Sequence, residues 1–168
     1  FRLALSSLLS MTVVCVANVS TLTACPFCAA VSQTFTEEID SMDAVVIGEL
    51  VKLPKKSDAP GEVASRETPK ATFQIVQVLK GGQFLLEATT IETIYFGDGQ
   101  IGKPFLIMGV DPPKIMWSTP LQLTERARKY VPELLALPKE GVVRLEFFQQ
   151  HLEDDDEMLA RDAYDEFA

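Results

Sequence analysis

The segment DAVVIGELVKL, residues 43–53, decides the fold of this chain. It is rich in β-branched side chains, which pack well on a pleated sheet, and it therefore predicts a strand. Gly48 lies inside this strand and predicts a bulge or a bend. Residues 54–69 follow with three prolines, one glycine and mixed charges but no hydrophobic periodicity, so they predict a long loop.

Four more strands are predicted after this loop, at 71–81, 84–96, 103–110 and 114–117. Turn residues separate them, namely Gly81-Gly82, the glycine-rich segment 97–102 and Asp111-Pro112-Pro113. No helical pattern interrupts the series, as it would in a parallel sheet built from βαβ units. The sequence thus predicts a five-stranded antiparallel barrel or sandwich over residues 43–117.

Helices are predicted on both sides of the strands. Residues 29–42 carry Val31, Phe35 and Ile39 at four-residue steps, which is one face of a short helix. After the strands the period changes, and helices are predicted over 120–137, 141–153 and the segment that follows Asp154-Asp155-Asp156. The fold class is therefore mainly β plus α, with a barrel followed by a helical segment that could begin a helical repeat.

Particular residues set the ends and faces of the downstream helices. Thr119-Pro120-Leu121-Gln122 reads as a capping box, and Pro132 predicts a kink. The second helix is expected to bury one common face, made of Val142, Leu145, Phe148 and Leu152. The three aspartates are expected to cap the third helix at the positive end of its dipole. Tyr164 and Phe167 are expected to pack on further helices beyond residue 168, so that 118–168 is a truncated start of the helical region.

The N-terminal segment predicts export. Residues 3–22 are nearly free of charge and rich in Leu, Val and Ala, which is typical of a secretory signal peptide over residues 1–24. Scattered Ser and Thr side chains make a permanent transmembrane anchor the weaker interpretation. Cleavage after Ala24 would leave Cys25 as the first mature residue. Leu22-Thr23-Ala24-Cys25 also resembles a bacterial lipobox, which would attach lipid to the Cys25 sulfur, and both outcomes stay open with a slight preference for plain secretion.

Composition excludes one class of partner. The net charge of −9 becomes −10 when Arg2 is removed with the leader. Nucleic-acid binding needs clustered Lys and Arg, and the basic cluster of Lys52, Lys55 and Lys56 is too small to reverse an acidic surface. We therefore expect no nucleic-acid partner, and contact with a membrane only through the signal peptide or a lipid anchor.

The mature chain has two cysteines, Cys25 and Cys28, in the sequence CPFC. In an exported chain this pair would usually oxidise to a disulfide. It also matches the CxxC of thiol–disulfide oxidoreductases, whose first Cys is nucleophilic at a helix N-terminus, but no strand precedes it here. A zinc site needs four ligands and His151 is the only histidine. The sequence therefore predicts no metal and no cofactor, and it favours a non-catalytic protein over an enzyme.

The order of these features resembles the group that contains tissue inhibitors of metalloproteinases and netrin-like domains. Cys25 opens the mature chain, Asp43-Ala44-Val45-Val46-Ile47-Gly48 resembles the first strand of that group, and Val78-Leu79-Lys80-Gly81 and Gly102-Lys103-Pro104-Phe105-Leu106-Ile107 resemble later strands. The resemblance covers residues 25–117 and implies a five-stranded OB barrel. It also implies that the Cys25 α-amine and carbonyl would chelate the zinc of a target protease, with 54–69 adding contacts. The spacing here is C-x-x-C, whereas that group has C-x-C.

A second resemblance concerns the two ends of the mature chain. CPFC at 25–28 together with Arg161-Asp162-Ala163-Tyr164-Asp165-Glu166-Phe167-Ala168 looks like uncharacterised secreted proteins of planctomycete-type bacteria, and this resemblance implies no activity. The sequence as a whole predicts an exported or lipid-anchored, non-catalytic module that binds a protein outside the cytoplasm, in the periplasm, at the cell envelope or secreted. The alternative is a redox protein that uses Cys25 and Cys28.

Overall fold

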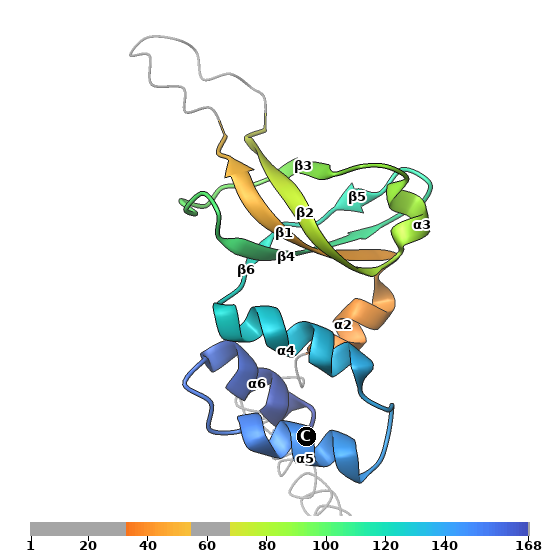
Figure 1. Ribbon diagram of the computed structural model, residues 1–168, viewed down its shortest axis with the longest axis vertical. Coiled ribbons are helices and arrows are strands. Elements are labelled where there is room, and N and C mark those ends of the chain that lie inside the picture. The colour runs from red at the N-terminus through yellow and green to blue at the C-terminus, as the bar shows by residue number, and fades with distance from the viewer. Residues whose placement is uncertain (1–32, 55–67, 168) are drawn as a thin grey trace, which may run out of the picture. The chain divides into compact units, whose positions relative to one another are not determined.

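Figure 1 shows the computed structural model, which describes residues 33–54 and 68–167. These residues belong to one compact unit. Its elements, in chain order, are α2 (Phe35–Ser41), β1 (Ala44–Lys52), β2 (Lys70–Lys80), α3 (Gly82–Leu85), β3 (Thr90–Ile94), β4 (Pro104–Val110), β5 (Met116–Trp117), β6 (Leu121–Gln122), α4 (Glu125–Ala136), α5 (Val142–His151) and α6 (Glu157–Asp165). The predicted class, a barrel followed by helices, is confirmed.

Strand β1 is the centre of the barrel. The strand order is β3-β2-β1-β4-β5, every pairing is antiparallel, and β6 pairs with β4 beside β5. Residues 44–47 of β1 are all buried because the strand lies between two cores: Val45 and Ile47 face one of them, and Val46 and Leu50 face the other. This explains why the segment reads as nearly continuous apolar sequence. The predicted bulge at Gly48 is confirmed by a register shift there against β2.

Three aromatic rings fill the interior of the barrel. Phe73, Tyr95 and Phe105 meet edge to face, with ring centroids 5.2–5.8 Å apart. This geometry places the positive edge of one ring against the negative face of the next. The barrel is nearly closed. At the seam between β3 and β5, the buried Thr93 hydroxyl lies 3.2 Å from the carbonyl oxygens of both Trp117 and Ser118.

The helices cover the face of the sheet opposite the barrel interior. Ala127, Tyr130, Val131 and Leu134 of α4 pack into the same core as Val45, Ile47, Leu106 and Met108 of β1 and β4. Figure 1 shows α4 between the barrel and the pair α5–α6. Thr124, the N-cap of α4, accepts from the Ala127 N–H and donates its own hydroxyl to Asp156, the N-cap of α6. The ends of α4 and α6 are therefore tied together.

The strand predicted at 84–96 is wrong in its first half. Gly81 adopts the left-handed conformation and starts the short helix α3, in which Leu85 is buried. Strand β3 begins only at Thr90. The apolar run Phe84-Leu85-Leu86 resembles a strand in composition, but hydrogen bonds between residues three apart in the sequence, from Phe84 N–H and Ala88 N–H, make it helical and turn-like.

The predicted capping box at 119–122 is also wrong. Leu121 and Gln122 instead form β6, which pairs with Leu106 and Phe105 of β4. The reason is an open edge: β5 covers only Gly109 and Val110 of β4, so the remaining backbone groups of that edge accept a second short strand. Helix α4 consequently starts at Glu125 and continues through Pro132.

The upstream helix is confirmed only over its described part. Residues 29–32 lie outside the described residues, and the helix begins at Phe35 after a capping box formed by Thr34 and Glu37. Phe35 and Ile39 are buried, as the four-residue spacing predicts.

Helix α5 buries a different face from the one predicted. Phe148 is buried, but Val142 and Leu145 are 69% and 51% exposed and Leu152 is exposed too. The cause is Arg144, whose guanidinium pairs with Glu166 at 2.6 Å, donates to the Thr36 hydroxyl at 2.8 Å and lies over the Phe148 ring. These contacts turn the Arg144 side of α5 toward α2 and α6.

Candidate functional site

The cysteines singled out by the sequence, Cys25 and Cys28, lie outside the described residues, as does the greater part of the predicted loop, 55–67. Both ends of that loop are described, at Leu53-Pro54 and Thr68-Pro69. The part of the barrel from which this loop leaves is described as well.

We call this part the loop end of the barrel, where β1 and β3 finish and β2 and β4 begin. Its strands are joined by backbone hydrogen bonds. Leu50 N–H donates to the Lys103 carbonyl at 3.1 Å, Gly102 N–H donates to the Leu50 carbonyl at 2.8 Å, and Tyr95 N–H donates to the Pro69 carbonyl at 3.1 Å. The connection from β3 to β4 is thereby held against the end of β1.

Apolar side chains gather at the loop end without being buried. Phe96 is 74% exposed and Ile101 is 58% exposed, and three more apolar residues there are also exposed. We call the set the apolar rim: Val51, Leu53, Ile94, Phe96 and Ile101. Single exposed apolar residues are ordinary, but several together at one end of a domain mark a surface that binds another molecule.

The segment that carries Phe96 and Ile101 is anchored on the barrel core. The Tyr95 hydroxyl accepts from the Gly99 N–H at 3.0 Å, while its ring packs against Phe73 and Phe105. A Cβ at Gly97 or Gly99 would overlap the Tyr95 side chain, so the chain can fold over that ring only with glycine at these positions. Phe96 and Ile101 of the apolar rim therefore lie on a segment whose backbone path is set by its packing on Tyr95.

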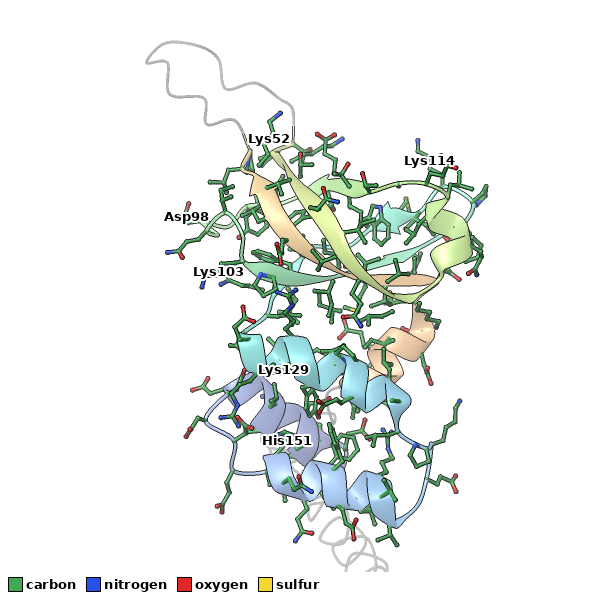
Figure 2. The ribbon with its side chains drawn as sticks, in the orientation of Figure 1. Lys52, Asp98, Lys103, Lys114, Lys129 and His151 are labelled. Carbon is green, nitrogen blue, oxygen red and sulfur yellow. The ribbon has the colours of Figure 1, made fainter. Side chains whose placement is uncertain are left out.

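Lysines surround the apolar rim. Lys52, Lys70 and Lys103 are exposed at strand ends of this part of the barrel, and none of them forms an ion pair within the described residues. Figure 2 shows Lys52, Asp98 and Lys103 at this end, with Lys114 at the other end of the barrel. The sequence indicates Lys52 as part of a basic cluster, but it does not indicate the rim. The signal available for the rim was two large apolar residues, Phe96 just before the glycine-rich segment 97–102 and Ile101 within it.

A second cluster of polar groups is buried among the helices. The Asp162 carboxylate accepts from the Phe35 N–H at 2.7 Å and from the Tyr130 hydroxyl at 2.6 Å. Burial raises the pKa of Asp162 and of Tyr130, because both charged forms lose hydration. All of these contacts join α2, α4 and α6 to one another, so the cluster has a structural role.

His151 and the aspartate run lie at the start of α6. Asp156 caps that helix through the Met158 N–H, which confirms the predicted capping role. Asp154 lies 3.1 Å from His151 Nδ1, pairs with Arg126 at 2.5 Å and accepts from the Asp156 N–H, and its side chain is 1% exposed. Over the described ranges, no group of three His, Cys, Asp or Glu side chains is placed to hold a metal ion.

The two buried aspartates are expected to affect the pH dependence of stability in opposite directions. Burial raises the pKa of Asp162 above its ordinary 3.8, and the nearby charges of Glu166 and Asp165 raise it further. Above pH 3.8 the native state therefore still holds a proton that the unfolded chain has lost. Stability contributed at Asp162 therefore falls as pH rises above 3.8. The hydrogen bond from the Asp156 N–H lowers the pKa of Asp154, and His151 and Arg126 lower it further. The stability contributed by the Asp154 carboxylate is therefore lost as pH falls below 3.8.

Urea unfolding of two variants across acid pH tests this prediction. Asp162→Asn should remove the fall in stability as pH rises above 3.8. Asp154→Asn should remove the fall in stability as pH drops below 3.8. Equal pH profiles for the two variants would contradict the assignment.

Comparison with known proteins gives no family: no protein-family model matches the chain, and no curated protein matches it. Among the described residues, no helix has the length and apolar character needed to cross a membrane. The OB-like barrel is therefore assigned from its own strand order and closure.

Proposed function

We propose that this chain is a non-catalytic protein-binding module, exported or lipid-anchored outside the cytoplasm, that binds its partner through the loop end of the barrel. The observation that carries the proposal is the apolar rim, in which Phe96 and Ile101 stand exposed on an anchored loop. Large aromatic side chains at the centre of an interface commonly supply most of its binding energy. A loop held in place before binding also loses less conformational entropy when the partner docks.

The position of the rim agrees with the resemblance to the tissue inhibitors of metalloproteinases and netrin-like domains. That resemblance implies that the loop between the first two strands contacts the partner. Here the loop leaves the barrel at Leu53 and returns at Thr68, beside Ile94 and Phe96. The proposal takes from that group only the use of this part of the barrel. Chelation of a protease zinc by Cys25, like a redox role for Cys25 and Cys28, stays a prediction.

Site-specific crosslinking in the native host tests the proposal. The full chain would carry a photoreactive phenylalanine analogue at position 96 or, as a control, at position 164, because Tyr164 is also an exposed aromatic residue. We expect a protein adduct from position 96 and none from position 164. An adduct from position 164 alone would show that the chain binds proteins through α6, and no adduct from either position would contradict the proposed function.

Phe96→Ser is expected to weaken binding of the crosslinked protein at least tenfold, that is, by about 1.4 kcal/mol or more, because truncation of a central aromatic residue commonly costs this much. Its effect on the free energy of unfolding should stay within about 0.5 kcal/mol, since the side chain is mostly exposed. Isothermal titration with the purified partner measures the first quantity and urea unfolding the second. Tyr164→Ser is the matched control and should leave the affinity unchanged.

A further inference from the structure

The charges of the loop end indicate which kind of partner it fits. Most described basic residues elsewhere are already engaged: Arg126, Arg128, Lys139 and Arg144 form ion pairs, and Lys80 donates to the carbonyls of Ile39 and Asp40. Lys52, Lys70 and Lys103 have no such partner within the described residues, and all three border the apolar rim. Their ammonium groups are available to an incoming molecule.

The barrel segment carries much less negative charge than the helical segment that follows it. Residues 118–168 hold twelve acidic and six basic side chains, a net charge of −6, whereas residues 43–117 hold nine acidic and eight basic, a net charge of −1. At physiological salt, charges more than about 8 Å apart are largely screened from one another. Among the described residues, a molecule docked at the loop end therefore experiences the three lysines there more than the acidic helices, with Asp98 and Glu92 as exposed acids on the same barrel.

An anionic membrane is a poor match for this surface. Recognition of acidic lipid by surface charge commonly uses clusters of about four to eight Lys and Arg residues. The described part of the loop end has three, and Asp98, two residues from Phe96, would lie against acidic headgroups.

Resting on the proposed function, we infer that the partner presents an acidic polypeptide segment with apolar side chains to the loop end of the barrel. Carboxylates of the segment pair with Lys52, Lys70 and Lys103 around its edge, and its apolar side chains cover Phe96 and Ile101 at the centre. This arrangement places charged pairs at a solvated rim and apolar contacts in the middle, as in other specific protein interfaces.

Two matched charge-reversal variants of the full chain test the inference. Lys52→Glu/Lys103→Glu changes the loop end, and Lys114→Glu/Lys129→Glu makes the same change in net charge on exposed lysines elsewhere. The probe is a 12-residue peptide in which Glu alternates with Leu and Phe, and a second peptide has Gln in place of Glu. Binding is followed by amide chemical shifts of the protein. We expect the Glu peptide to shift resonances around Phe96 and Ile101, with at least about tenfold weaker binding to the first variant and unchanged binding to the second.

Other results would overturn the inference, and they separate it from the proposed function. Equal binding of the Glu and Gln peptides would show that only the apolar contacts matter. Shifts with phosphatidylglycerol vesicles but with neither peptide would identify a membrane-binding surface instead. If the native partner still crosslinks from position 96 in the Lys52→Glu/Lys103→Glu variant, protein binding stands and the acidic character of the partner is wrong. Loss of the crosslink in the Lys114→Glu/Lys129→Glu variant as well would likewise contradict a local role of the loop-end lysines.

Discussion

Asp162→Ala is expected to destabilise the protein by about 2–6 kcal/mol. The substitution leaves two buried donors, the Phe35 N–H and the Tyr130 hydroxyl, without an acceptor, and each such group costs about 1–3 kcal/mol. Since the contacts at 2.7 Å and 2.6 Å join α2 and α4 to α6, the loss should loosen all three helices together. Urea unfolding monitored by circular dichroism gives the difference in free energy.

Asp155→Ala is the matched control for this variant. Asp155 lies in the same aspartate-rich region but is exposed, so its replacement should change stability by less than about 0.5 kcal/mol. If Asp162→Ala cost no more than this control, the buried cluster would not be what holds the helices together.

Gly81→Ala is expected to cost about 2–5 kcal/mol. Gly81 has a φ of 71°, a conformation that costs a residue with a side chain about 1–2 kcal/mol. In addition, an alanine Cβ would overlap the Asp43 carbonyl oxygen and come within 2.8 Å of the Ala44 Cα, so the start of β1 would have to move. Displacing a packed backbone adds at least a further 1–3 kcal/mol or so. The midpoint of urea denaturation measures the loss.

Gly102→Ala separates the two contributions. Gly102 has a φ of 83°, but a Cβ there would meet no atom within 4 Å. Its replacement should therefore cost only the conformational part, about 1–2 kcal/mol. Equal losses at Gly81 and Gly102 would show that the contact with Asp43 is not important.

The barrel could be predicted from the sequence because its local signals agree with its packing. The apolar run at 44–47 is buried on both faces, and Gly48 lies at a bulge. The motif ending in Lys80-Gly81 also has a structural explanation: Lys80 donates to the last carbonyls of α2, and Gly81 packs on the first residues of β1. In this chain, these residues therefore have a structural role, which is to join the barrel to its preceding helix.

The errors arose where distant contacts decided the outcome. Leu121 and Gln122 became a strand because β4 had an open edge, which a local helix pattern cannot reveal. Helix α5 turned its Arg144 side inward because Glu166 and Thr36 lie there, although the apolar period favoured burial of the side that carries Val142 and Leu145.

The candidate site could be predicted only in part. The sequence shows Lys52 as a member of a basic cluster, but the exposure of Phe96 and Ile101 depends on how the segment after β3 folds over Tyr95. Local sequence does not encode the position of the underlying Tyr95 ring, and that position decides whether Phe96 is buried or exposed. The sequence therefore indicates individual residues of the site, but it does not show that they form one surface.

The hydrogen bond between the two N-cap residues has an evolutionary consequence. The Thr124 hydroxyl is both the cap of α4 and the donor to Asp156, which in turn caps α6. A mutation that removes either side chain therefore weakens the starts of two helices at once, and groups coupled in this way do not change independently without loss. In descendants of this chain, a hydroxyl residue at position 124 and a carboxylate at position 156 should be inherited, lost or exchanged as a pair.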